Sequence, residues 1–254
     1  MQGRIIVTLR CLEQIRVSSC IMKIPVTIVG VGAGFGYADS GPTHHLMEDI
    51  AIMRAFPGIT INSISDRIMA AEVAERCAFA SVTNYVRLDR MPCPDLYEKT
   101  PDFQNGFAVL GEGKDGCIVS TGFMTHTAMG VSDTQRKQGI DLGVIDVYRL
   151  PTNEDDLAEV IKNSGKVITL EEHFLPGGFG SYILEILNDR EIALPVKRLG
   201  LPFDRGYCYT YGGREKIHEY YGVNPEAVAS DIGAYFALGN EELVPVSASS
   251  GQLT

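Results

Sequence analysis

The sequence predicts an α/β protein of two domains, each built on a mainly parallel β-sheet. Short runs of β-branched and other apolar residues alternate with segments of helical apolar spacing, the pattern of strands joined by helices. This alternation is interrupted once, by RMPCPDLYEKTPDFQNG at 90–106, which contains three prolines and no periodicity. A chain of 254 residues, 45% of them hydrophobic, is long enough for two cores. We therefore expect a first domain at 1–95, a linker at 96–105, a second domain at 106–238 and a disordered tail at 239–254.

The first domain is expected to contain three strands. Helical spacing of Leu9, Leu12 and Ile15 precedes them, and Pro57 with Gly58 ends a later helix. In chain order we expect a strand at IPVTIVGVG (24–32) buried on both faces, a helix from about His44 to Ala55, a strand at ITINSIS (59–65), a helix at 66–80 capped by Ser65 or Asp66, and a strand at NYVRL (84–88).

The second domain is expected to repeat strand and helix three times. We expect strands at CIVSTG (117–122), GVIDVYRL (143–150) and KVITLEE (166–172). A first helix should end near Gly139, a second should be capped by Thr152 with Asp155 at the capping-box position, and a third should lie within 177–189. Ligands of such sheets bind at the carboxyl ends of the strands, so the loops at those ends are the candidate functional segments.

Composition argues against several classes of partner. With 22 Lys and Arg against 32 Asp and Glu, the net charge of -10 disfavours a nucleic-acid or anionic-lipid surface. The six cysteines, at 11, 20, 77, 93, 117 and 208, contain no C-x-x-C pair, so we interpret them as thiols of a reducing compartment. Charges at Arg4, Arg10, Glu13 and Arg16 interrupt any apolar stretch near the start. We therefore expect a cytoplasmic protein with no nucleic-acid or membrane partner.

The first candidate loop is GVGAGFG (30–36). Gly32, Gly34 and Gly36 alternate, and Gly41-Pro42 blocks the helix that a dinucleotide-binding loop needs directly after it. A close backbone approach to another chain or to a ligand is therefore favoured over a nucleotide site.

The second candidate is the pair His44 and His45 in GPTHHLMEDIAIMRAFPG (41–58). If Thr43 caps the helix, both lie in its first turn, where free N–H groups favour an anion and keep an imidazole neutral. A neutral histidine can donate a proton near neutral pH. Two alternatives stay open: a structural role for at least one histidine, and a metal site, for which Glu48 has the spacing from His44 but no third ligand is evident.

Two further loops contain charged residues. Arg87 and Arg90 in YVRLDR (85–90) are expected to point to opposite faces, so that one enters a cleft and the other pairs with a carboxylate. In LEEHFLPGGFGS (170–181), Glu171, Glu172 and His173 are interpreted as a polar network at a sheet edge.

Taken in order, these motifs resemble the carboxyl-terminal half of the transketolase family, which includes 1-deoxy-D-xylulose-5-phosphate synthase. The resemblance is strongest to the small subunit of split bacterial transketolases and covers about residues 7–235. It rests on TLRCLEQIR, PVTIVGVGAGFGY, GPTHHLMEDIAIMRAFPG, YVRLDR, the STG strand end, VIDVYRLPTNEDDL, TLEEH with GGFGS, and LGLP followed by YGGREKIHEYYGV. It implies a truncated thiamine-diphosphate pyrimidine-binding domain followed by a transketolase C-terminal domain.

The resemblance also implies a cofactor and a partner. In this family the C2 carbanion of thiamine diphosphate attacks a ketose, and a two-carbon ketol unit passes between sugar phosphates while protein groups bind, orient and move protons. The family's diphosphate and Mg²⁺ site, with its G-D-G motif, belongs to the amino-terminal part, and this sequence contains no G-D-G. Thiamine diphosphate and Mg²⁺ are therefore expected only at an interface with a separate N-terminal transketolase subunit, around a homodimer core of this chain.

The resemblance implies roles for four residues, although none can be named as a cofactor or metal ligand. His44 and His45 match the catalytic histidines that contact substrate hydroxyls and the thiazolium side. Arg90 matches the arginine that binds the substrate phosphate, a task suited to a forked guanidinium. Ser40 stands where many transketolases have a sugar-binding aspartate, with Asp39 beside it.

Two departures from the family pattern support an alternative. The G-I-A-E-Q segment, whose glutamate activates the cofactor, is absent and would lie before Met1, and Ile5 and Ile6 occupy the stretch where aromatic residues stack on the pyrimidine. The alternative is a catalytically inactive fragment or paralogue that keeps only the fold and the subunit-binding surface.

Overall fold

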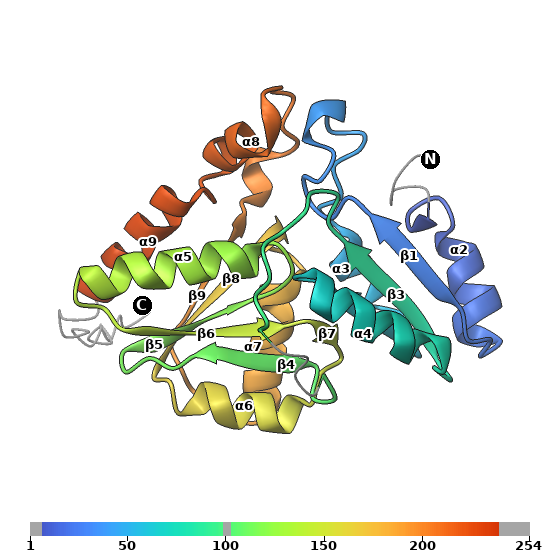
Figure 1. Cartoon of the computed structure of the whole chain (residues 1–254), viewed down its shortest axis with the longest axis horizontal. Coiled ribbons are helices and arrows are strands. Elements are labelled where there is room, and N and C mark those ends of the chain that lie inside the picture. The colour runs from blue at the N-terminus through green and yellow to red at the C-terminus, as the bar shows by residue number, and fades with distance from the viewer. Residues whose placement is uncertain (1–6, 99–102, 239–254) are drawn as a thin grey trace, which may run out of the picture.

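Two α/β domains packed side by side make up the computed structural model, which describes residues 7–98 and 103–238 (Figure 1). The sheet of the first domain has the strand order β1-β3-β2-β7, and that of the second has the order β4-β6-β5-β8-β9. All neighbouring pairs are parallel except β2 with β7 and β4 with β6. The strands are β1 Thr27–Val31, β2 Ile59–Ser63, β3 Thr83–Leu88, β4 Phe107–Gly111, β5 Gly116–Ser120, β6 Leu142–Val147, β7 Arg149–Leu150, β8 Lys166–Phe174 and β9 Val196–Leu201.

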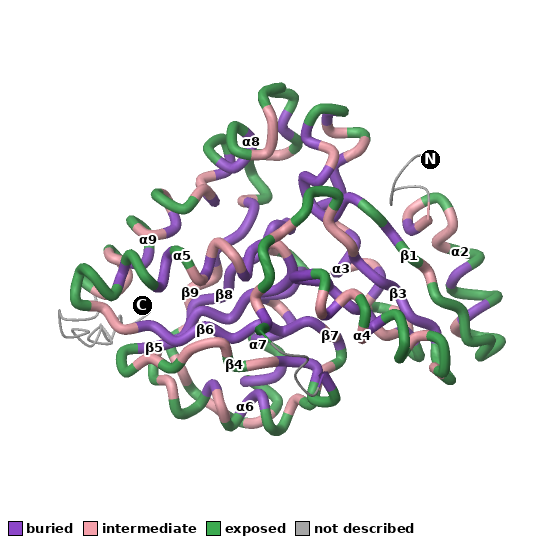
Figure 2. The backbone as a smooth tube through the Cα atoms, viewed as in Figure 1, coloured by how far each residue is buried: buried purple, intermediate pink, exposed green. Residues whose placement is uncertain are grey.

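Helices cover both faces of the second sheet. Helices α5 and α9 lie on one face and α6 and α7 on the other, as Figure 1 shows. The three central strands, β5, β6 and β8, are buried along nearly their whole length (Figure 2). The α-helices are α2 Leu12–Gln14, α3 Asp49–Met53, α4 Arg67–Ala78, α5 Met124–Lys137, α6 Glu154–Lys162, α7 Phe179–Asp189, α8 Gly213–Tyr221 and α9 Pro225–Leu238. A π-helix η1 Ile15–Ile21 and two 3-10 turns, η2 Ala38–Ser40 and η3 Phe203–Arg205, complete the elements.

The two domains are joined by a β-strand pairing and by shared apolar packing. Strand β7 follows the second domain's β6 in the chain but pairs with β2 of the first domain, through Ile61 with Leu150 and Asn62 with Arg149. One cluster of buried apolar side chains extends from Tyr85 in β3 to Ile183 in α7. The carboxyl ends of β1 and β3 are therefore held next to the second domain.

The first strand differs from its prediction. β1 lies at one end of the sheet that the described residues form, and Val29 and Val31 are 51% and 39% exposed instead of buried on both faces. An apolar run predicts a strand, but its burial depends on which elements cover it.

Two predicted helix starts are corrected by the structure. The helix expected from about His44 begins only at Asp49, because Leu46 forms an isolated antiparallel bridge with Gly34. His44 and His45 therefore precede the helix and do not lie among its first-turn N–H groups. Helix α6 is capped by Asn153, which accepts from Asp156 N, and not by Thr152, whose hydroxyl donates to Asn105 O. The cap predicted for α4 is confirmed, since Asp66 accepts from Met69 N at 2.8 Å.

Some expectations fall outside the described residues: the tail at 239–254, and Ile5 and Ile6. Among the described helices, none combines the length and the apolar character that a bilayer crossing needs. All six cysteines are free thiols.

Candidate functional site

The candidate site lies where the carboxyl ends of β1 and β3 face the second domain. The loop after β1 runs from Gly32 to Glu48 and lies beside α8 (Figure 1). The end of β8, with Glu171, Glu172 and His173, approaches the same junction.

The glycine loop is packed against a carboxylate of its own chain. Gly34 has a φ of +51°, and a Cβ there would overlap the side chain of Glu172, whose Oε2 accepts from Phe35 N at 3.1 Å. The close backbone approach predicted from the glycines is present, but its partner is a side chain of the second domain.

Glu172 is the centre of a buried network of charges. Its carboxylate accepts from Arg214 Nε at 2.8 Å and from His218 Nε2. Burial by itself would raise the pKa of Glu172, but Arg214 and His218 hold it far below its ordinary value. Arg214 Nη1 also lies 2.7 Å from Asp89 Oδ2 and forms an ion pair with it. Neither of these two atoms makes a hydrogen bond of normal geometry within the described residues. Glu172 therefore stays ionised and links α8 to the glycine loop.

Asp49 and Arg87 form a second buried ion pair. Arg87 Nε donates to Asp49 Oδ2 at 2.7 Å, Nη2 to Oδ1 at 3.0 Å, and Nη1 to Ser63 Oγ at 3.1 Å. The Tyr85 hydroxyl also donates to Asp49 Oδ2 at 2.7 Å. Of the two arginines in YVRLDR, Arg87 is thus the one paired with a carboxylate, and it ties α3 to β3.

Arg90 and His44 meet at the ring of Tyr37. The exposed Arg90 guanidinium lies 5.0 Å from the Tyr37 ring centroid, and the ring of His44 lies 6.4 Å from it. His44 is partly exposed, and its Nδ1 is 3.0 Å from Thr43 Oγ1. Ser40 is exposed at the end of η2, in the same loop. The structure thus places the exposed Arg90 and the partly exposed His44 next to the same ring, that of Tyr37.

His45 is placed differently from its neighbour. Its side chain is 2% exposed, its ring packs edge-on against Phe35 at 5.1 Å, and neither ring nitrogen has a hydrogen-bond partner among the described residues. Burial lowers the pKa of His45 and keeps the imidazole neutral. A buried neutral imidazole lacking partners is suited to meet a polar group supplied from outside the chain.

The residues Glu171, Glu172 and His173 do not form an edge network, because β8 lies between β5 and β9. Glu171 accepts from the N–H groups of Phe179 and Gly180 at the start of α7, and burial raises its pKa to about 8. His173 donates from Nδ1 to Phe174 O and accepts at Nε2 from Ala51 N, so it is neutral. Burial, the largest cause, lowers its pKa.

The described residues do not fit the diphosphate and metal end of a thiamine cofactor. They contain no group of three or more His, Cys, Asp or Glu that could hold a metal ion. The cavity at the domain junction, between the glycine loop and the ends of β5 and β8, has a volume of about 10 Å³, enough for a single water.

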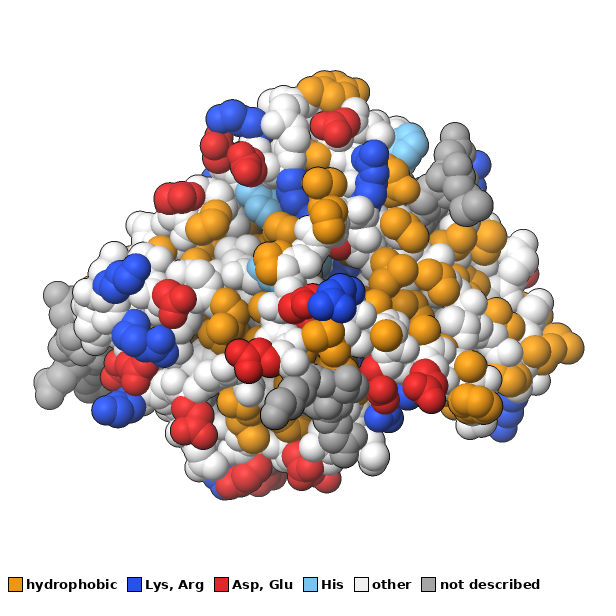
Figure 3. Space-filling model, in the orientation of Figure 1, with side chains coloured by type: hydrophobic (Ala, Val, Ile, Leu, Met, Phe, Trp, Pro, Cys, Tyr) orange, Lys and Arg blue, Asp and Glu red, His pale blue; other side chains and the backbone are white. Residues whose placement is uncertain are grey.

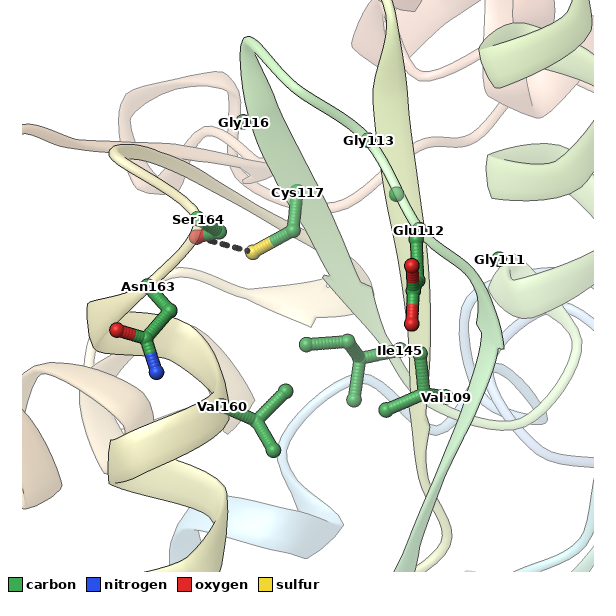
Figure 4. A pocket seen from close by; sticks show the side chains of 11 residues that line it. Val109, Gly111, Glu112, Gly113, Gly116, Cys117, Ile145, Val160, Asn163 and Ser164 are labelled. Carbon is green, nitrogen blue, oxygen red and sulfur yellow. Dashed lines mark hydrogen bonds between the residues drawn. The ribbon is translucent and has the colours of Figure 1, made fainter.

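A larger pocket of about 390 Å³ lies elsewhere, at the start of β5 and the end of α6 (Figure 4). Its buried polar groups satisfy one another: Cys117 Sγ lies 3.1 Å from Ser164 Oγ, which donates to Ile161 O. It contains none of the candidate site residues His44, His45, Arg90 and Ser40, and no orphaned polar group within it points to a ligand.

Sequence reasoning missed three residues of the site, Tyr37, Asp89 and Arg214. All three lie inside motifs that the sequence analysis quotes, PVTIVGVGAGFGY, YVRLDR and YGGREKIHEYYGV, but none was given a role. Arg214 follows Glu172 by 42 positions, so no local spacing reveals their contact. Only information about contacts between distant positions of the chain could have identified this pair.

Fold and site together define a class: a two-domain α/β protein whose polar site lies where the sheets of both domains converge. Comparisons give the family. The family models described as transketolase, pyrimidine binding domain and as transketolase, C-terminal domain match residues 6–91 and 106–228. One subunit of the apulose-4-phosphate transketolase of Phocaeicola vulgatus is 30% identical over 222 residues, which cover 86% of this chain and 70% of that protein. The chain belongs to the transketolase family.

Other comparisons agree with this membership. A 1-deoxy-D-xylulose-5-phosphate synthase of Gloeothece citriformis is 34% identical over 203 residues, covering 76% of this chain but 31% of the relative. A solved structure described as a split gene transketolase, inactive beta4 tetramer, is 29% identical with a TM-score of 0.81, over 92% of this chain and 74% of that chain. A transketolase from Campylobacter jejuni, 18% identical over 90% of this chain and 34% of that one, has a TM-score of 0.72 and shares the fold.

Proposed function

We propose that this chain is the carboxyl-terminal component of a two-subunit, thiamine-diphosphate-dependent transketolase that transfers a two-carbon ketol unit between sugar phosphates. The observation that carries the proposal is that the exposed Arg90 and the partly exposed His44 both lie next to the ring of Tyr37, in a chain of the transketolase family. The relative that is one subunit of an apulose-4-phosphate transketolase, and the split gene transketolase among the solved structures, support a division of the enzyme into two chains.

The accessible residues have chemistry that suits a sugar phosphate. The Arg90 guanidinium offers a planar fork of N–H donors that matches a phosphate, and Tyr37 supports it from one face. The contact of His44 with Thr43 uses Nδ1 and leaves Nε2 for a substrate hydroxyl. Ser40 and the buried His45 are the further candidates, Ser40 for a sugar hydroxyl and His45 for proton transfer on the cofactor side.

The first domain also presents a surface for a partner. Hydrophobic side chains gather over β1, β3 and α4 (Figure 3), where a groove of about 330 Å³ is lined by Val29, Ala74, Leu88 and their neighbours. Phe79, at the end of α4, is 87% exposed. Contiguous exposed apolar surface of this kind is typical of a protein interface. We propose that the N-terminal subunit, which holds the diphosphate and Mg²⁺, binds at this surface, and that two copies of this chain form the centre of the complex.

Reconstitution tests the proposal. The chain is mixed with an N-terminal transketolase subunit, thiamine diphosphate, Mg²⁺, a ketose phosphate and an aldose phosphate, and product sugar phosphates are measured. We expect transfer only when both chains are present. A complex that forms and binds cofactor but transfers nothing would favour the alternative, an inactive paralogue that keeps the subunit-binding surface.

A matched pair of variants tests the surface. Val29→Glu places a charge on the exposed face of β1 and should weaken the complex, whereas Val109→Glu, at a valine of similar exposure in β4, should not. Equal affinities of both variants for the N-terminal subunit would show that it binds elsewhere.

A further inference from the structure

One arginine of the second domain is tied to both loops that hold the proposed site residues. Arg214, near the start of α8, contacts Glu172 through Nε and Nη2 and Asp89 through Nη1. Glu172 in turn accepts from Phe35 N in the glycine loop. The side chains of Arg214, Glu172 and Asp89 are 12%, 6% and 7% exposed, so water screens these contacts little.

Asp89 fixes the backbone on both sides of Arg90. Its Oδ1 accepts from Met91 N at 2.9 Å, while its Oδ2 faces Arg214 at 2.7 Å. Arg90 lies between Asp89, which is paired with Arg214, and Met91, whose amide donates to Asp89. A displaced Asp89 would therefore shift the backbone from which the Arg90 side chain extends.

Phe35 connects the same network to His45. The amide of Phe35 donates to Glu172, and its ring packs edge-on against His45. The Arg214 guanidinium itself is fixed, because its carbon lies 3.5 Å from the ring centroid of Phe123. A planar, bidentate arginine in this setting has little freedom to move.

We propose that Glu172 and Arg214 are positioning residues through which the second domain sets the geometry of Arg90 and His45 in the first domain. The proposal rests on the proposed function for its catalytic consequence, but its structural part stands on the contacts alone. It assigns the second domain an indirect task in phosphate recognition, because Glu172 and Arg214 would orient Arg90 without touching the substrate themselves.

Hydrogen exchange of the free chain tests the structural part. Arg214→Met should speed exchange at the amides of 32–36 and 88–91 by about tenfold to a hundredfold, since a hydrogen bond to a charged group is lost. The control is Arg54→Met, which breaks another ion pair between the domains, with Glu185 on α7, away from these loops. Unchanged exchange in the loops of the Arg214→Met variant, or the same acceleration in both variants, would overturn the proposal.

A milder variant covers the case in which Arg214→Met does not fold. Asp89→Asn keeps the size of the side chain and removes only the charge that faces Arg214. It should accelerate exchange at 88–91 while leaving the amides of α8 protected. Wild-type exchange at 88–91 in this variant would equally overturn the proposal.

Kinetics of the reconstituted complex test the catalytic part. Asp89→Asn acts on the Arg90 side of the network and leaves the Glu172 contact with Phe35 in place, so it should raise the KM for phosphorylated sugars by about tenfold while changing kcat/KM for unphosphorylated sugars little. Equal losses for both kinds of sugar would indicate a merely structural role and reject the assignment. If the wild-type complex transfers no ketol unit, the proposed function fails, and hydrogen exchange still decides whether Arg214 holds the loops.

Discussion

Arg87 is enclosed in the core and binds both carboxylate oxygens of Asp49, joining β3 to α3 just below the loop that contains His44 and His45. The two side chains are 5% and 0% exposed. Burial opposes the charge of Arg87, yet its pKa is raised because Asp49 is in contact. Each charge is stable in the core only because the other is present.

Removing one partner of this pair should destabilise the fold strongly. We expect Arg87→Met to cost ~3–5 kcal/mol in the free energy of unfolding, because Asp49 is left as an uncompensated buried charge. The double variant Arg87→Met with Asp49→Asn should recover part of this loss. Urea unfolding of both variants measures the difference, and a double variant no more stable than Arg87→Met would contradict the assigned pairing.

Two glycine substitutions should separate backbone strain from steric overlap. Both Gly34 and Gly58 have positive φ, but a Cβ on Gly34 would overlap Glu172, whereas a Cβ on Gly58 would meet nothing within 4 Å. Gly58→Ala should cost about 1 kcal/mol, and Gly34→Ala should cost ~2 kcal/mol more because Glu172 must move. Thermal unfolding compares them, and similar melting temperatures would show that the loop can shift away from Glu172 freely.

The buried Glu171 should make stability fall as the pH rises. Its pKa is about 8 in the folded chain, above its ordinary value of 4.5, so between these pH values the folded state holds a proton that the unfolded state has lost. Stability from this group is full below about pH 4.5 and declines towards pH 8, by up to ~1.4 kcal/mol per pH unit. Subtracting the unfolding free energies of Glu171→Gln from those of the wild type isolates the effect, and a difference that stays constant from pH 5 to 8 would disprove it.

Arg90 should discriminate between phosphorylated and unphosphorylated sugars. In the reconstituted complex, Arg90→Ala should raise the KM for sugar phosphates by about tenfold to a hundredfold, since a charge-assisted contact is lost, with little effect on unphosphorylated substrates. Arg136→Ala on α5, an exposed arginine of the second domain, is the control. Steady-state kinetics with matched sugar pairs give the answer, and equal effects on both members of a pair would remove Arg90 from the phosphate site.

The order of elements could be predicted from the sequence because it depends on local patterns. The strands at β2, β3, β5, β6 and β8 follow their apolar runs, and Asp66 caps α4 as its position before the helix indicates. The start of the helix after His45 could not be predicted, because Leu46 forms a bridge with Gly34, a contact between the two ends of the long loop after β1 that helical spacing cannot represent.

The candidate site was predictable only in part, and for the same reason. His44 and Arg90 stand out by residue type and by their place after strands, but their meeting at Tyr37 depends on how two loops fold over each other. The burial of His45 and the exposure of β1 likewise depend on which other segments of the chain cover them.

By itself the sequence determined the α/β class, the succession of strands and helices and the family, since periodicity, caps and ordered motifs act over a few residues at a time. The tertiary structure alone decided that Glu172 and Arg214 of the second domain hold the loops of the first. Such contacts join residues far apart in the chain, and their strength comes from burial, which no local pattern specifies.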